Sequence, residues 1–301
     1  MDTKKVIRSA FTVGFFIAAS RIFGLIRDIS LAAFFGTSMA MSAFVVAFTI
    51  PNLFRSLFGE GALSAAFIPV FTESLKKEGK EHTWRFAVNM YSILTVVLAS
   101  LVIAGILIAT ALLFYFPGNE RICLILRLLR ILLPYMFFIC MAAFFAAMLN
   151  SLHYFTVPAA APVVLNLVLI ATVLLICPHL NSEGNIRIIA VAWSVILAGV
   201  LQWLMQFPLL LRCGFRPGFS INWKDPRIRR VRQLIAIAII GIGVTRLNVL
   251  CDRFIAVFLG PESPSYLYFA ERLIYFPLGI FATALGTVIL PAFPAMPHMR
   301  R

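Results

Sequence analysis

Long stretches without a charged residue restrict the fold of this chain more than any other feature. Three of them run from Phe86 to Asn119, from Ile131 to Ser182 and from Ile188 to Leu211. A bilayer-spanning helix needs about 20 mostly apolar residues, so the second stretch is long enough for two crossings. The composition agrees, because 61% of the residues are hydrophobic, 13% are charged and the mean hydropathy is +0.97, unlike soluble domains. The sequence therefore predicts an all-α, polytopic transmembrane helix bundle.

Eight membrane spans are predicted, at about 20 residues per crossing, separated by turn-forming Pro, Gly and Asn residues. They cover roughly residues 8–35, 42–74, 84–114, 124–150, 157–177, 187–211, 233–259 and 266–292. The second is over-long and is broken by Pro51, Gly59 and Gly61, which leaves room for residues 62–73 to lie along the membrane interface. No soluble domain, internal repeat or cleavable secretion signal is expected.

Basic residues are distributed unevenly between the predicted loops. With the N-terminus inside, the cytoplasmic segments 4–8, 76–85, 212–232 and 300–301 hold 16 Lys and Arg residues, against Arg121 and Arg187 outside. Because Lys and Arg accumulate in cytoplasmic loops, this asymmetry predicts a cytoplasmic N-terminus. Topology and attraction to anionic membrane lipids account for the net charge of +14, so no binding of nucleic acid is expected.

Few residues suit catalysis or metal binding. The five cysteines show no CxxC spacing, so neither a disulfide framework nor a zinc site is expected. The histidines are isolated, and the twelve acidic residues form no DxD or HxE pair. A membrane enzyme acting on polyprenyl phosphates needs such clusters, so the chain is not expected to be an enzyme. No ATP-binding motif is present either.

Four arginines fall inside apolar stretches, namely Arg21, Arg27, Arg55 and Arg272. A charge at membrane depth costs at least ~2.5 kcal/mol on insertion scales, so such residues indicate a water-filled cavity and an anionic partner. The arginines therefore predict that the protein handles a negatively charged substrate within the membrane.

The first predicted span contains the densest polar cluster, Ser20 to Asp28. On an ideal helix Arg21 and Asp28 share a face, whereas Arg27 points about 120° away from Arg21. Gly24 lies between the two arginines and would allow a bend that brings both to one cavity. The alternative is that Arg27 pairs with Asp28 or with Glu60 near a rim of the membrane.

In the second span, Arg55 lies at the break that Pro51 and the glycines introduce. Backbone groups freed by such a break are tolerated against protein or a wet cavity, so Arg55 is a candidate for substrate contact. The alternative is that Arg55 extends its side chain to the cytoplasmic interface.

The seventh span carries Thr245, Asn248 and Asp252 at i, i+3 and i+7. This spacing stacks oxygen ligands on one helix face, as a cation site requires. Arg246 and Arg253 form a second stripe about 100° around the helix. The alternative is an ion pair of Arg253, either with Asp252 or across helices.

The eighth span begins with Tyr268, Arg272 and Tyr275 on one face, and Glu271 beside them. An interfacial belt is the safer interpretation of Tyr266 and Tyr268. Arg272 with Glu271 remains a candidate site.

At these residues the chain resembles a known family, the MurJ (formerly MviN) lipid II flippases of the multidrug/oligosaccharidyl-lipid/polysaccharide exporter superfamily. The similar segments follow the family order along nearly the whole chain. They are SRIFGLIRD (20–28), AFVVAFTIPNLFRSLFGEGALSAAFIPVF (43–71), LPYMFFICMAAFFAAMLNS (133–151), TVPAAAPVVLNLVLI (156–170) and YFAERLIYFPLGIFATALGTVILPAF (268–293).

The resemblance implies a flippase of the bacterial cytoplasmic (inner) membrane. It would move lipid II, an undecaprenyl-diphosphate-linked sugar-peptide, from the inner to the outer leaflet by alternating access, for cell wall synthesis. Arg21, Arg27 and Arg272 would hold the diphosphate and headgroup, and Arg55 would act near the cytoplasmic entrance. Supporting roles fall to Ser20, Gly24, Asp28, Glu60 and Glu271. No cofactor is implied apart from a sodium ion, for which Asp252 matches an acidic ligand of some members, joined here by Asn248 and Thr245.

Two departures from the family pattern matter. Ser42 stands where the family usually has an acidic residue before the second span. Family members have about fourteen helices, so the chain corresponds to a six-helix lobe (1–211), a basic cytoplasmic loop (212–232) and the start of a second lobe (233–301). A truncated or inactive remnant that needs a separate C-terminal half is therefore one alternative. An exporter of another polysaccharide lipid or of a drug is the other.

Overall fold

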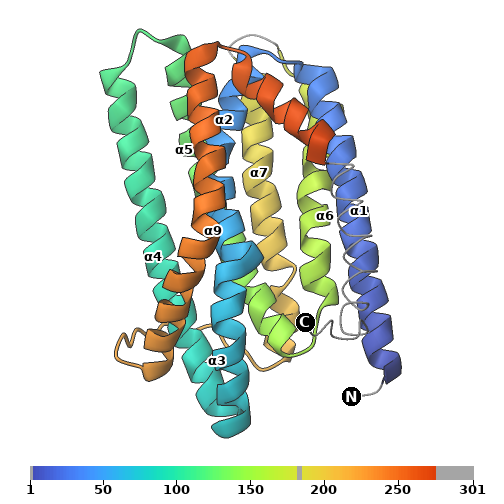
Figure 1. The fold of residues 1–301 in the computed structure, drawn as a ribbon, viewed down its shortest axis with the longest axis vertical. Coiled ribbons are helices and arrows are strands. Elements are labelled where there is room, and N and C mark those ends of the chain that lie inside the picture. Colours follow the sequence, from blue (N-terminus) through green and yellow to red (C-terminus); the bar gives the residue numbers. More distant parts are fainter. Residues whose placement is uncertain (1–2, 182–184, 276–301) are drawn as a thin grey trace, which may run out of the picture.

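The computed structural model describes residues 3–181 and 185–275, and for residues 3–10, 58–61, 242, 244 and 245 it describes the helical backbone but not the side chains. Every regular element in these ranges is a helix, which confirms the all-α prediction (Figure 1). The later part of the predicted eighth span, residues 276–292, lies outside the described residues.

The helices follow the predicted spans closely. They are α1 (Thr3–Phe35), α2 (Met39–Phe54), the π-helical segment η1 (Arg55–Ala62), α3 (Leu63–Lys77), α4 (Gly79–Tyr115), α5 (Glu120–Ser151), α6 (Thr156–Ala171) with its extensions η2 (Thr172–Ile176) and η3 (Cys177–His179), α7 (Ile186–Leu204), α8 (Phe207–Arg212) and α9 (Pro226–Leu259). Residues 263–275 are also helical. Within the described residues, five helices are long and apolar enough to cross a membrane, or six if the two parts of α9 count as one span.

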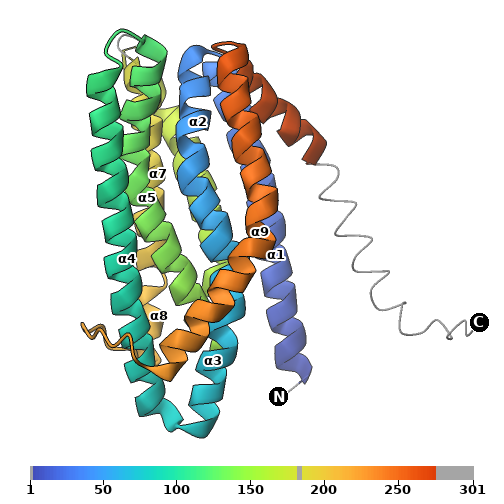
Figure 2. The same cartoon turned by 60° about the vertical axis from the view of Figure 1, so that its left-hand side comes forward.

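The over-long second span is made of α2, η1 and α3 in succession. The π-helical turns of η1 coincide with the break predicted from Pro51, Gly59 and Gly61, since wider turns accommodate irregularities inside a helix. Figures 1 and 2 show α3 continuing along the bundle to the end where α4 begins. An orientation of residues 62–73 across the bundle, along a membrane surface, is therefore not found.

Helix α9 starts earlier than the predicted seventh span. Asp225 caps it, because its side chain accepts a hydrogen bond of 2.9 Å from the backbone N–H of Arg227, and Pro226 occupies the first turn. Both are favoured at helix starts, so part of the predicted basic loop is helical. Farther along, the segments Pro226–Gly241 and Arg246–Leu259 form an angle of 51°.

The core forms around α5, which packs on α2, α3, α4 and α7. Its aromatic residues Tyr135, Phe144 and Phe145 are fully buried. Gly199 of α7 lets that helix approach α5 closely, because a Cβ atom there would lie 2.7 Å from the Tyr135 ring. In contrast, α1 lies at the edge of the bundle and packs mainly on α6, which leaves one side of α1 open.

The two ends of the bundle differ in what they carry. At one end, called here the N-terminal end, lie the start of α1, the turn from α3 to α4, and the start of α9 (Figures 1 and 2). At the opposite end, residues 263–275 run from the end of α9 across to α1 (Figure 1). That crossing places the predicted eighth span beside the polar cluster of the first.

Candidate functional site

Arg27 and Asp28 form the centre of a polar cluster at the end of the bundle opposite the N-terminal end. Arg27 donates hydrogen bonds from Nε and Nη2 to Asp28 Oδ1, at 3.0 and 2.7 Å. Its side chain is 14% exposed. The alternative interpretation of Arg27, a pair with Asp28, is therefore confirmed, but the pair has further partners that sequence reasoning did not supply.

Asp28 also binds two residues of the helical segment 263–275. Tyr268 donates its hydroxyl hydrogen to Asp28 Oδ1 at 2.8 Å, and Arg272 Nε lies 3.3 Å from Oδ2. The guanidinium carbon of Arg272 is 5.0 Å from the centre of the Tyr268 ring, within the range of a cation–π contact. The Tyr268 hydroxyl therefore lies inside the cluster, and the interpretation of Tyr266 and Tyr268 as interfacial belt residues stays a prediction.

The charges of this cluster do not balance. One carboxylate, that of Asp28, lies between the guanidinium groups of Arg27 and Arg272, so among the described side chains of this cluster one positive charge remains uncompensated. The Arg272 side chain is 46% exposed, so part of its guanidinium group is accessible to a ligand. Arginine presents a planar fork of donors that matches phosphate and carboxylate oxygens, so the cluster can bind an anion.

Asn166 of α6 is a member of the cluster that sequence reasoning missed. Its Oδ1 accepts a hydrogen bond of 2.9 Å from Arg27 Nη1, and its Nδ2 donates one of 3.0 Å to the backbone oxygen of Ser20. It is 5% exposed. A lone amide inside the apolar segment 156–170 was the available signal, because polar residues in membrane helices usually make interhelical contacts.

The structure does not bring Arg21 into this cluster. Helix α1 is one continuous α-helix from Thr3 to Phe35. Gly24 lies next to the Asn166 side chain, because a Cβ atom added at Gly24 would be 3.6 Å from Asn166 Nδ2. The Arg21 side chain is exposed, and no carboxylate of a described residue pairs with it. Arg21 and Arg27 thus remain on different sides of α1, and the predicted bend at Gly24 that would bring both to one cavity is not found.

Arg55 lies elsewhere along the bundle. It begins η1, and its Nε donates a hydrogen bond of 2.8 Å to Asn52 Oδ1, one turn earlier. Sixteen residues at 1.5 Å each place it roughly 24 Å along α2 from the helix start, toward the N-terminal end. The side chain of Glu60, the predicted supporting residue, lies outside the described residues.

The predicted cation ligands on α9 are only partly described. Asn248 and Asp252 are exposed, and the side chain of Thr245 lies outside the described residues. Arg253 does not pair with Asp252. It forms a cross-helix ion pair with Glu271 instead, which confirms one of the two alternatives. The described part of the chain contains no group of three or more His, Cys, Asp or Glu side chains that could hold a metal ion, so a sodium site remains a prediction.

Ser42 joins α2 to the segment 263–275. Its Oγ lies 2.5 Å from Ser265 Oγ and accepts a hydrogen bond of 3.3 Å from the Ser265 backbone N–H. Both serines are buried. Neutral hydrogen bonds therefore connect these two helices.

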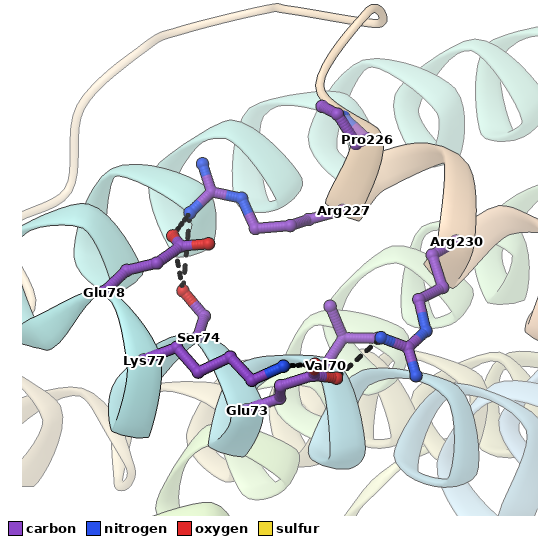
Figure 3. A pocket seen from close by; sticks show the side chains of 8 residues that line it. All are labelled: Val70, Glu73, Ser74, Lys77, Glu78, Pro226, Arg227 and Arg230. Carbon is purple, nitrogen blue, oxygen red and sulfur yellow. Dashed lines mark hydrogen bonds and ion pairs between the residues drawn. The ribbon is translucent and has the colours of Figure 1, made fainter.

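A second group of charged residues joins α3 to α9 at the N-terminal end (Figure 3). Arg227 Nη1 donates to Glu78 Oε2 and Arg230 Nη1 to Glu73 Oε2, both at 2.6 Å. Arg227 also pairs with Asp225 at 2.8 Å. The adjoining cavity of about 200 Å³ is lined by these paired groups. The acids and bases neutralise one another, so this group connects the two helices.

Two carboxyl groups at that end have altered pKa values. Hydrogen bonds from Lys77 and Arg230 hold the pKa of Glu73 below its usual range. Burial raises the pKa of Asp225, but hydrogen bonds from the side chain and backbone of Arg227 outweigh it and keep the pKa below its usual range. Both groups are therefore ionised at neutral pH, as the connection between α3 and α9 requires.

Comparisons with known proteins agree on one family. The family described as "Lipid II flippase MurJ" matches residues 31–297. The "Probable lipid II flippase MurJ" of Vibrio cholerae is 34% identical over 302 residues, which cover 96% of this chain and 57% of that protein. The "Lipid II flippase MurJ" of Burkholderia cenocepacia is 34% identical over 296 residues, with coverages of 95% and 57%.

A solved structure, "Lipid II flippase MurJ, inward closed conformation", superposes with a TM-score of 0.76 at 25% identity. The match covers 95% of this chain and 58% of that one. The chain thus spans a little more than half the length of the relatives it matches.

Proposed function

The chain belongs to the MurJ family of lipid II flippases, and from that premise we propose that it carries lipid II from the inner to the outer leaflet of the bacterial cytoplasmic membrane. The observation that supports this most is the uncompensated positive charge of the cluster formed by Arg27, Asp28 and Arg272. Lipid II carries a diphosphate, and the half-exposed guanidinium of Arg272, beside the Arg27–Asp28 pair, is suited to bind it.

The diphosphate needs such a partner because it must cross ~30 Å of hydrocarbon, where an unpaired charge is strongly disfavoured. We propose that Arg272 and Arg27 receive the diphosphate at one end of the path. Arg55 contacts the substrate nearer the N-terminal end, and the exposed Arg21 meets it between them. A rocking motion of two lobes about this path would expose the substrate alternately to each side.

Electrical energy is sufficient to favour the outward direction. An inside-negative potential drives an anion outward by about 2.3 kcal/mol per charge per 100 mV, so nucleotide hydrolysis is not needed. A sodium ion bound at Asp252 and its neighbours would return the empty carrier. This chemistry is transport and not catalysis, because no bond of the substrate changes.

The N-terminus is proposed to face the cytoplasm. Helix ends at the N-terminal end of the bundle carry the basic segments 76–85 and 212–232 (Figure 2), and basic residues favour the cytoplasmic side. In a cysteine-free chain in intact cells, Gly118→Cys should react with a membrane-impermeant maleimide and Lys76→Cys should react only after lysis. The reverse pattern would rule out this orientation.

A flipping assay tests the substrate. Proteoliposomes that contain the chain together with a C-terminal half should expose a fluorescent lipid II to an external, membrane-impermeant quencher faster than protein-free vesicles do. A matched lipid with the same diphosphate and a sugar lacking the peptide serves as the comparison substrate. Faster transport of that comparison lipid than of lipid II would favour the alternative, an exporter of another lipid-linked polysaccharide. Because the chain spans little more than half of its relatives, the assay should be run with and without a C-terminal half.

A further inference from the structure

Only two charged side chains among those the structure describes are buried, Asp28 at 8% and Arg253 at 4% exposure. Asp28 belongs to the cluster that the proposed function uses, and Arg253 does not. A buried charge is costly unless partners compensate it, so the contacts of Arg253 show what its burial achieves.

Among the described residues, the hydrogen-bond, ion-pair and cation–π partners of the Arg253 side chain lie on the segment 263–275. Arg253 Nη2 pairs with Glu271 Oε2, and Nη1 donates a hydrogen bond of 3.1 Å to the backbone oxygen of Pro264. Its guanidinium carbon lies 5.8 Å from the centre of the Tyr268 ring. Residues 264, 268 and 271 are spaced i, i+4 and i+7, so Arg253 follows one stripe of that helix.

The same stripe borders the anion site. The Tyr268 ring has contacts with Arg253 and, at 5.0 Å, with Arg272, while its hydroxyl is bonded to Asp28. Glu271, which Arg253 holds, directly precedes Arg272 in the chain. A rotation of the segment about its own axis would therefore remove both Tyr268 and Arg272 from Asp28.

We propose that Arg253 is a positioning residue that links α9 to the anion site by fixing the rotation of the segment 263–275. The start of this segment is held separately, through the Ser42–Ser265 hydrogen bonds to α2. That second attachment limits translation, and Arg253 acts on the turns that carry Tyr268 and Glu271. A change in the bend of α9 would thus reach Arg272 through Arg253. Only the consequence for transport rests on the proposed function.

Arginine suits this task better than lysine because its rigid fork directs several N–H donors at once, here to a carboxylate and a carbonyl, while its face meets an aromatic ring. Lysine would keep the charge opposite Glu271 but would lose the simultaneous contact with Pro264. The geometry therefore predicts that lysine at position 253 partly maintains the rotation of the segment 263–275 and that alanine does not maintain it.

Distance measurement between spin labels tests the link. In a chain whose native cysteines are replaced, labels at Ile29 on α1 and Leu273 on the segment are exposed, at 58% and 75%. Without substrate, R253A should shift and broaden the distance distribution, E271Q should shift it in the same direction, and R253K should lie between R253A and the unmodified sequence. R229A, which removes an exposed arginine of the same helix, should change nothing.

An unchanged distribution in R253A, or a shift in R253A that E271Q does not reproduce, would overturn the inference. If R253A fails to insert, R253K and E271Q still decide, because both retain the size of the native side chain. With lipid II, R253K should raise the apparent KM about tenfold and change kcat less. Absence of transport by the unmodified chain together with a C-terminal half would count against the proposed function alone, since the label distances need no transport.

Discussion

Arg272→Ala should lower lipid II transport by roughly 10- to 150-fold while the chain still inserts into the membrane at the unmodified level. A hydrogen bond to a charged group contributes about 1.5–3 kcal/mol, and each 1.4 kcal/mol is about a tenfold change in binding. The expected loss of transport is the loss of that contact with the diphosphate. Insertion should be unaffected, because the Arg272 side chain is 46% exposed and its removal leaves Asp28 paired with Arg27.

Substitution of Arg272 tests substrate binding with less effect on folding than substitution of Arg27 would have. Arg27 joins α1 to α6 through Asn166 and also neutralises Asp28, so its removal would affect the bundle as well as the ligand. Arg229→Ala is the matched control, because it removes the same charge from an exposed position on α9. Arg272→Lys should retain part of the activity as a point charge. Transport by Arg272→Ala at the unmodified rate, with equal protein in the membrane, would contradict the proposed role.

The helices of this fold could be predicted from the sequence because apolar length is a local property. The uncharged stretches around α4, α5 and α7 are long enough for membrane spans, and the helices begin within a few residues of the predicted limits. The early start of α9 is not predicted, because the basic, polar composition of residues 212–232 favours a loop, although Asp225 and Pro226 are typical of a helix start.

The candidate site could be predicted only in part, because partner choice depends on tertiary structure. Helical spacing places Arg21 and Arg27 on different sides of α1 and makes Asp28 an evident partner of Arg27, but the expected bend at Gly24 is not found. Asn166 is 139 residues from Arg27 along the chain, and Tyr268 is 240 residues from Asp28. No local pattern connects such residues, and Tyr268 also resembled an interfacial belt residue. These contacts form only because the segment 263–275 crosses to α1 (Figure 1).

One face of α9 exposes both polar and large apolar side chains. Asn248 and Asp252 are exposed on this helix, as are the large apolar side chains of Leu247, Phe254 and Ile255. Asp252 precedes the helix end by seven residues, which is roughly 10 Å along the axis. A carboxylate at such a depth is disfavoured against lipid and requires protein or water beside it. The face is therefore suited to contact further helices around an aqueous path.

Co-expression of a C-terminal half is accordingly expected to change the chain from inactive to active in cells depleted of their own lipid II flippase. The 301-residue chain alone should not restore growth, because within residues 3–181 and 185–275 this face of α9 is exposed. The remaining segment of the Vibrio cholerae relative, expressed as a separate polypeptide, should restore growth and co-purify with the chain. The same segment with the Arg272→Ala chain should co-purify and fail to restore growth, which separates assembly from transport. Full growth with the 301-residue chain alone would show that these helices suffice, and the proposed need for a partner would then be wrong.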